Sequence, residues 1–262
     1  MAWCAGLDKA SAGGPEERME QKYSKGFTVL PSQVDAYGRL SVPKTFDLFM
    51  DIATEAATAI GVGVDFLKRR GLFWITVKTR IRFLKRPALM DEVRVSTWPE
   101  RPVGKRCNRY YEICDASGES LVQGKTEWAI VSALTGRPQD MEKLMPEGLD
   151  ASIPPVCPEP FGMIDESFGE APFAEHIVTA TDIDMAGHMN NVAYVRAIVN
   201  AFSVKAWRKM DVREMIVVFR ASAHESDRLL LQRRQSGDIL DLRGSLPNGE
   251  TIVLARLITG RH

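Results

Sequence analysis

The sequence predicts an α+β fold made of one unit written twice, in which each copy packs a long central helix on a curved antiparallel sheet. Three observations indicate this. A short polar motif occurs twice with the same internal spacing, an apolar helical stripe follows each copy, and several strand-like runs follow each stripe. A chain of 262 residues, 45% hydrophobic and 26% charged, has the composition of a globular protein with room for such a core.

The repeated motif reads DAYGRLS at residues 35–41 and DMAGHMN at residues 184–190. Each copy begins with an aspartate and has a glycine at its fourth position, Gly38 or Gly187. Self-similarity that continues through the elements that follow indicates a duplicated structural unit. We therefore expect the two segments to occupy equivalent places in two copies of the fold.

A helix is expected after each motif. In the first copy Ser41 is placed to cap the helix and Pro43 lies in its first turn, and the apolar residues at helical spacing are Phe46, Phe49, Met50, Ala53, Ala57 and Ile60. In the second copy the cap is Asn190 or Asn191, and the apolar residues are Tyr194, Val195, Ile198, Val199 and Phe202. Each stripe can bury one face of its helix on a sheet.

Strands are expected after each helix, because the runs there alternate or are rich in β-branched residues. The first copy has such runs at residues 74–83, 92–97, 109–113 and 120–132. The second copy has them at residues 215–220, 228–232, 239–243 and 251–258. A glycine-containing turn precedes the last strand of each copy, at residues 115–119 and 246–250.

A proline-rich segment at residues 137–172 separates the copies, and its composition favours a linker that crosses the surface over a packed element. The expected division is a disordered leader at residues 1–20, a first unit at 21–158 and a second unit at 159–262. The leader contains no apolar run of signal-peptide length, and its acidic residues argue against a transit peptide.

The bulk properties argue against several classes of function. Formal net charge is zero and the pI is about 6.9, so no global field draws the chain to nucleic acid. The four cysteines, Cys4, Cys107, Cys114 and Cys157, have no metal-ligand spacing and are too scattered for a disulfide framework, which fits a reducing cytoplasm. No run of apolar residues is long enough to span a membrane. We expect no cofactor and no metal.

The sharpest local signal is the run TDIDMAGHMNN at residues 181–191, where two carboxylates, a histidine and two amides lie between a strand and a helix. Its pattern D-x-D-x-x-G-H-x-N-N resembles the signature of hotdog thioesterases. The repeat, the chain length and the segments FWIT at 73–76 and STWP at 96–99 resemble the acyl-acyl carrier protein (acyl-ACP) thioesterase family in particular. The resemblance extends from about residue 24 to residue 258.

The resemblance implies a tandem double hotdog whose second half is catalytic. It maps the family's catalytic residues onto Asp184, as base or nucleophile, and His188, which assists. The implied reaction is hydrolysis of the acyl-ACP thioester with release of free fatty acid. Thioester hydrolysis needs such a base, and the amides at the start of the following helix are suited to hold the oxyanion.

The first copy has Arg39 where the second has His188, so it is expected to be catalytically inactive. Its implied role is to house the acyl chain among Phe46, Phe49, Met50 and Ile60, with filling of the core as the alternative for each of these four side chains.

The sequence departs from the family at two expected polar positions. Ala186 stands where many members have Asn, and Ser222 stands where a Glu is expected. Asp-x-Ala-Gly also resembles the broader hotdog superfamily, in which Asp acts without that Asn. His224 or Glu225 is the candidate to replace the absent Glu in space, with a plain surface turn as the alternative. Asn190, Asn191, Ser222 and Glu225 are therefore secondary site candidates. The alternative functions are an acyl-CoA thioesterase and a catalytically weak acyl-binding hotdog protein.

A basic row is predicted on the strand at residues 74–83, where Lys78, Arg80 and Arg82 alternate with apolar residues and Thr79. Displayed to solvent, this row is suited to an acidic acyl carrier protein; a solvated strand face is the alternative. No nucleic acid partner is expected, because the row has no interleaved aromatic residues. Both a monomer and a homodimer are compatible with the sequence.

Overall fold

The structure is a computed structural model that describes residues 22–146, 149 and 152–260. The expected leader at residues 1–20 lies outside the described residues. The first unit contains β1 (Tyr23–Thr28), a 3-10 turn (Pro31–Gln33), α1 (Val42–Ala59), α2 (Val64–Lys68), β2 (Leu72–Phe83), β3 (Glu92–Pro99), β4 (Cys107–Asp115) and β5 (Ser120–Ser132). The second contains β6 (Ala174–Ile177), a 3-10 turn (Ala180–Asp182), α3 (Asn191–Asn200), α4 (Val204–Met210), β7 (Val212–Phe219), β8 (Arg228–Ser236), β9 (Ile239–Ser245) and β10 (Thr251–Thr259).

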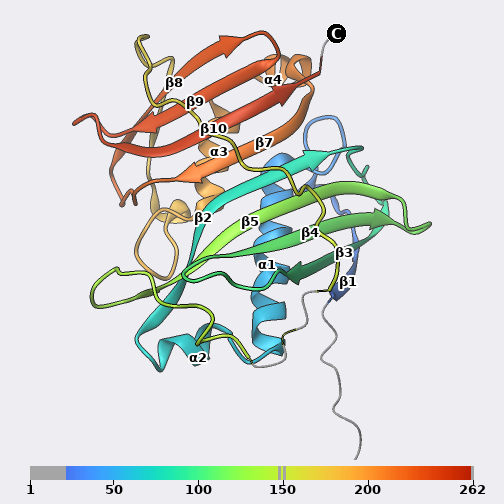
Figure 1. Ribbon diagram of the computed structural model, residues 1–262. Helices are drawn as coiled ribbons and strands as arrows, with labels where there is room; N and C mark the ends of the chain where they lie inside the picture. Colours follow the sequence, from blue (N-terminus) through green and yellow to red (C-terminus); the bar gives the residue numbers. More distant parts are fainter. Residues whose placement is uncertain (1–21, 147–148, 150–151, 261–262) are drawn as a thin grey trace, which may run out of the picture.

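The ten strands form one antiparallel sheet in the order β1-β3-β4-β5-β2-β7-β10-β9-β8-β6. Outward from the β2–β7 pair, both halves have the same order, since β5, β4, β3 and β1 correspond to β10, β9, β8 and β6. At the seam, Arg80 pairs with Ile216 and Arg82 with Glu214 in antiparallel register. Helices α1 and α3 lie on one face of the sheet (Figure 1). This is the double hotdog that the duplicated pattern predicts.

The helix starts follow from their caps. Ser41 Oγ accepts a hydrogen bond from the Lys44 backbone N–H at 3.2 Å, and Asn190 Oδ1 accepts one from the Val192 N–H at 2.8 Å. Asn190, not Asn191, is therefore the cap of α3. The apolar stripe of α1 turns toward the sheet, and Phe46 and Phe49 are fully buried there.

Every predicted strand is present, within a few residues of its expected ends. Of the four side chains predicted to house the acyl chain, two follow the stated alternative and fill the core. Phe46 and Phe49 fill the core, and the Phe49 ring stacks on Tyr111 with centroids 4.5 Å apart. Met50 is the member of the predicted set that lines a cavity, and Ile60 packs in a small separate cluster.

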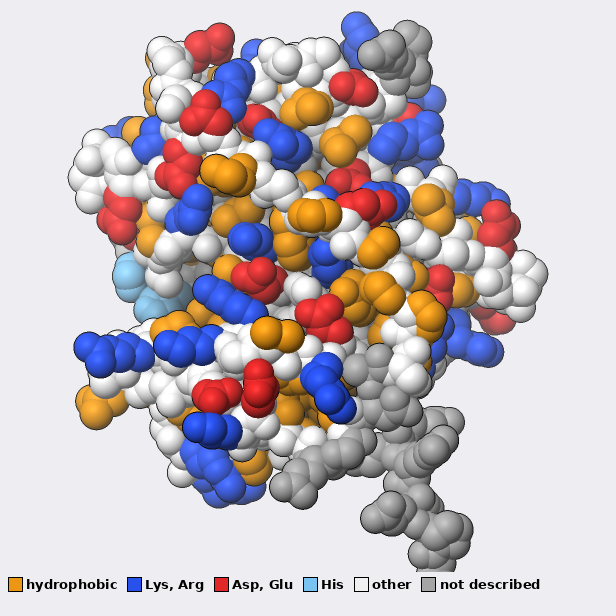
Figure 2. All heavy atoms as spheres, viewed as in Figure 1, with side chains coloured by type: hydrophobic (Ala, Val, Ile, Leu, Met, Phe, Trp, Pro, Cys, Tyr) orange, Lys and Arg blue, Asp and Glu red, His pale blue; other side chains and the backbone are white. Residues whose placement is uncertain are grey.

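The prediction of a solvent-displayed basic row on β2 is wrong for Arg80, whereas the side chains of Lys78 and Arg82 stay about one-third exposed. The linker crosses the outer face of the sheet (Figure 1) and covers Arg80, which is only 5% exposed. Arg82 hydrogen-bonds Glu214 and Glu159, and Lys78 lies 3.9 Å from Glu127. Figure 2, drawn from the same side, shows Lys and Arg side chains interspersed with Asp and Glu over the described part of this face.

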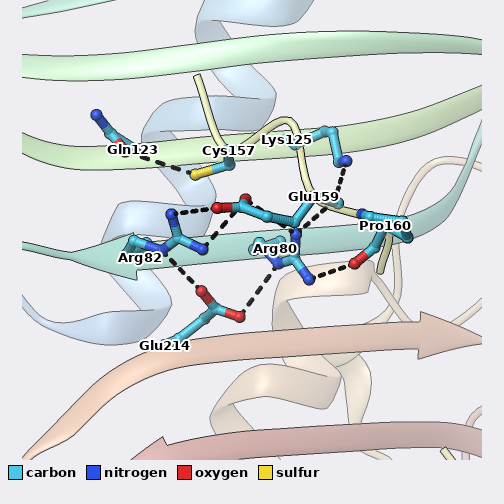
Figure 3. A network of polar contacts seen from close by, with 8 residues as sticks. All are labelled: Arg80, Arg82, Gln123, Lys125, Cys157, Glu159, Pro160 and Glu214. Atoms are coloured by element: carbon cyan, nitrogen blue, oxygen red, sulfur yellow. Dashed lines mark hydrogen bonds and ion pairs between the residues drawn. The ribbon is translucent and has the colours of Figure 1, made fainter. Parts of the chain in front are cut away.

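The basic side chains hold the linker through its carbonyls (Figure 3). Arg80 donates to the carbonyls of Glu159 and Pro160, both at 2.7 Å, and Lys125 donates to the Glu159 carbonyl at 2.6 Å. A proline-rich segment has few N–H donors and cannot join a sheet, so side-chain donors are needed to satisfy its carbonyls. The linker is accordingly packed rather than loose, and Phe161 and Ile164 are buried against β7 and β10.

Candidate active site

The motif at residues 184–190 forms a tight loop that leaves the Asp184 side chain exposed. The Asp184 N–H donates to the His188 carbonyl at 2.9 Å, and the Gly187 N–H donates to the Asp184 carbonyl at 3.0 Å. Gly187 has φ +77°, a conformation that favours glycine. Asp184 Oδ1 accepts a hydrogen bond from the Ala186 N–H at 2.8 Å, which fixes the carboxylate at the loop.

The other carboxylate of the motif, Asp182, is buried and holds the backbone. Its Oδ2 accepts hydrogen bonds from the Thr179 N–H and lies 3.0 Å from His176 Nε2. Burial alone would raise the pKa of Asp182, but the hydrogen bonds from Thr179 and His176 lower it below the ordinary value. Asp182 is therefore a structural carboxylate beneath the loop.

The segment after β7 packs against the motif and brings a second histidine to it. The Met189 N–H donates to the Ala223 carbonyl, and the Ala223 N–H donates to Tyr194 Oη at 2.9 Å. Burial raises the pKa of Tyr194 to about 12, so its hydroxyl stays protonated at neutral pH. The rings of His188 and His224 meet edge to face with centroids 5.0 Å apart. Histidine side chains reach the surface at the left edge of Figure 2.

Two adjacent cavities adjoin the motif. One, of about 390 Å³, is lined by the motif, by the start of α3 and by Ser222. The other, of about 310 Å³, runs between α1 and strands β2, β4 and β5 of the first unit. Four residues line both cavities, namely Trp74, Trp128, Asp184 and Asn190. Asp184 thus lies where the second unit meets the cavity of the first.

Most of the predicted site residues come together. Asp184, His188, Asn190, Asn191 and Ser222 all line the 390 Å³ cavity. Glu225 lies in the exposed turn before β8 and is not among the residues that line either cavity. Of the two candidate substitutes, His224 contacts the motif through the His188 ring, but it also lines neither cavity.

Sequence reasoning missed three groups that line the larger cavity: the aromatic pair Trp74 and Trp128, Arg220, and the α1 carboxylates Asp47 and Asp51. Burial raises the pKa of Asp51. The two α1 carboxylates lie four residues apart, on the polar side of the predicted helix, and that spacing was the available signal.

Within the described ranges, no group of three or more His, Cys, Asp or Glu side chains is arranged to hold a metal ion. None of the helices described is both long and apolar enough to cross a membrane.

Comparison with known proteins connects both units to one family. Residues 20–148 match the acyl-ACP thioesterase N-terminal domain, and residues 166–250 match the acyl-ACP thioesterase C-terminal domain. The chain is 21% identical over 226 residues to oleoyl-acyl carrier protein thioesterase 2, chloroplastic, of Arabidopsis thaliana, covering 78% of this chain and 60% of that protein. It is 23% identical over 163 residues to the palmitoyl-acyl carrier protein thioesterase of the same plant, covering 58% of this chain and 39% of that protein.

Solved structures share the fold. An acyl-ACP thioesterase from Bacteroides thetaiotaomicron superposes with a TM-score of 0.80 at 19% identity, covering 92% of this chain and 98% of that one. The 12:0-ACP thioesterase from Umbellularia californica superposes with a TM-score of 0.73 at 15% identity, covering 90% and 96%. Since the two domain matches together take in most of the sequence, in the order and halves that the duplicated fold shows, the chain belongs to the acyl-ACP thioesterase family.

Proposed function

We propose that this protein hydrolyses the thioester of acyl-acyl carrier protein and releases the free fatty acid, with Asp184 as base or nucleophile and His188 assisting. The observation that carries the proposal is the position of Asp184, which lines both cavities and belongs to the motif beside α3. Family membership of both units supports the same reaction class.

Asp184 is suited to act on water or on the carbonyl carbon. Its Oδ1 is held by the Ala186 N–H, and the exposed side chain faces the cavity with its second oxygen available. In the general-base route, Asp184 takes a proton from water while the water oxygen bonds to the carbonyl carbon. The carbon–sulfur bond of the tetrahedral intermediate then breaks, and the leaving sulfur takes up a proton. A thiol has an ordinary pKa of about 8.5, so the thiolate is a good leaving group even without protonation. His188 is the nearby group suited to donate a proton to it.

The start of α3 is suited to stabilise the developing oxyanion. Asn191 opens this ten-residue helix and lines the cavity with Asp184, next to Val192, whose N–H is already taken by the Asn190 cap. The N–H groups at a helix start and the positive end of its dipole favour negative charge. Ser222, exposed on the same cavity, offers a hydroxyl where the family resemblance leads one to expect a carboxylate.

The two units have different roles in this proposal. The first unit, residues 21–158, supplies the cavity for the acyl chain between α1 and its sheet, and the second unit, residues 159–262, supplies the chemistry. The mostly apolar lining of the 310 Å³ cavity supports the first assignment.

Purified protein, given acyl-ACP and acyl-CoA with the same acyl group, tests the proposal through release of free thiol. We expect hydrolysis of acyl-ACP, and a loss of about a hundredfold or more in kcat for Asp184→Asn, which keeps the loop hydrogen bond but removes the charge. The control is Asp35→Asn, because Asp35 holds the equivalent turn in the first unit, through the Tyr37 N–H at 2.9 Å, and lines neither cavity. Asp35 also pairs with Arg39 and Arg86, so circular dichroism must first show that this variant is folded.

The outcomes separate the candidate functions. Preference for acyl-CoA would favour the alternative acyl-CoA thioesterase, a candidate supported by the burial of Arg80, which leaves only Lys78 and Arg82 of the predicted carrier-facing row partly exposed. Tight acyl binding without thiol release would leave an acyl-binding protein. An unchanged rate in Asp184→Asn would rule out the assigned base.

A further inference from the structure

Arg109 is a buried cation that the proposed chemistry does not use. It lies on β4 two residues before Tyr111, and alternate residues of a strand share a face, so both point toward α1. Its Nη1–H donates to Thr97 Oγ1 at 3.3 Å, and it forms no ion pair with a carboxylate of the described residues. Burial lowers the pKa of Arg109, because it takes the charged guanidinium out of water. A buried ion that lacks a counter-ion is strongly unfavourable.

The side chain borders the same cavity as the proposed catalytic carboxylate. Of the described residues that line the 310 Å³ cavity, Arg109 is the one basic residue and Asp184 the one acidic residue. Apolar residues make up much of the rest, including Ala53, Ala57 and Trp74. A charged donor in an apolar pocket fixes the orientation of a ligand and selects for a matching group.

The second unit provides an internal control for the role of Arg109. The turns before β5 and β10 have the same hydrogen bonds, from the Asp115 N–H to the Glu119 carbonyl and from the Leu246 N–H to the Glu250 carbonyl. Aligning these turns places Arg109 opposite Leu240, which is 2% exposed in the core. The fold therefore accepts an apolar side chain at this position, and Arg109 is not required by the architecture.

We propose that the acyl group accepted by this protein carries a distal oxygen function, preferentially a carboxylate, which pairs with Arg109 while the thioester lies at Asp184. This proposal rests on the proposed function, because the proposed function places the thioester at Asp184 and so directs the far end of the acyl group toward Arg109. A chain that ends in a methyl group would cover the guanidinium without accepting any of its hydrogen bonds. A distal carboxylate accepts two and supplies the missing counter-charge.

Binding of non-hydrolysable analogues tests the proposal without turnover. Three acyl-pantetheine analogues of equal, medium chain length carry an amide in place of the thioester and end in a methyl, a hydroxyl or a carboxylate group. Calorimetry with the full chain should give a dissociation constant about tenfold or more lower for the carboxylate than for the methyl analogue, with the hydroxyl between them. In Arg109→Met this preference should vanish.

The control variant is Arg106→Met, which removes a cation just outside β4 that is half exposed and lies 3.6 Å from Glu127. It should keep the wild-type preference. Equal affinity of the wild-type protein for all three analogues, or no binding of any, overturns the proposal even if Arg109→Met does not fold. A preference that survives in a folded Arg109→Met protein overturns it as well. Because no analogue is hydrolysed, a failure of Asp184 to catalyse would leave this result readable.

Discussion

Two aspartates only two positions apart have opposite environments in the motif. Asp182 is 6% exposed and is surrounded by donors from Thr179 and His176, whereas Asp184 is exposed at the cavity. The difference arises because a 3-10 turn ends at Asp182 and directs that side chain into the protein. A buried carboxylate with several donors stabilises the loop, and an exposed one is free to meet a substrate.

The pH dependence of stability should distinguish the two aspartates. The pKa of Asp182 is lower in the folded protein than its ordinary value, so its contribution is present above about pH 4 and is lost as pH falls through the folded pKa. Asp182→Asn should lower the free energy of unfolding by about 1–2 kcal/mol at pH 7 and by less at pH 3, measured by urea denaturation. Asp184→Asn is the control and should change it little at either pH. Equal effects of both variants would contradict the assigned environments.

Single residues also mark the limit of prediction from sequence. The polar motif predicted that Asp184, His188 and Asn190 lie together, because all three are within seven consecutive residues, and they line one cavity. The burial of Arg80 was not predictable, since it depends on a linker that is distant in sequence and crosses β2 only in the folded chain. The same holds for Arg109, whose cavity combines residues from both units.

At the scale of elements, a glycine sets how closely α1 approaches the sheet. A Cβ on Gly124 of β5 would overlap the ring of Phe49. Phe49 is fully buried and stacked on Tyr111, so it has no free space into which to move. The close contact between the helix and the sheet therefore depends on the absence of a side chain at residue 124.

Gly124→Ala should destabilise the protein by about 1–3 kcal/mol through overpacking. Chemical denaturation measures the loss. Gly26→Ala is the matched control, because Gly26 also lies in a strand but has no atom within 4 Å of its added Cβ. The combined variant Gly124→Ala with Phe49→Leu should recover part of the lost stability. An unchanged stability of Gly124→Ala would show that α1 can shift away from β5 at little cost.

The elements that sequence patterns predicted are the long ones. The runs at residues 109–113 and 120–132 revealed the strands β4 and β5, and the helical stripe from Phe46 to Ile60 revealed α1, which has eighteen residues. The short helices α2 and α4, of five and seven residues, were not predicted, since so few residues contain too few turns for a periodic signal.

At the scale of the whole molecule, the two units are joined through a seam that contains buried charge. Glu214 of β7 lies 3.1 Å from Arg80 Nε, as an ion pair without a well-aligned hydrogen bond, and 2.8 Å from Arg82 Nε. The same two arginines bind the linker at Glu159 (Figure 3). One cluster thus connects both halves of the sheet and the segment between them.

Removing the anion from this cluster should weaken both units at once. Glu214→Ala leaves two guanidinium groups at the seam, one of them buried, and should lower the free energy of unfolding by about 3 kcal/mol or more. Glu175→Ala, which breaks the exposed pair with Arg228 on β6 and β8, is the control and should cost about 1 kcal/mol or less. Tryptophan fluorescence follows mainly the first unit and circular dichroism follows both, so coincident transitions indicate unfolding as one body. A cost for Glu214→Ala no larger than that of the control would show that the seam is held by its strand pairing and apolar contacts instead.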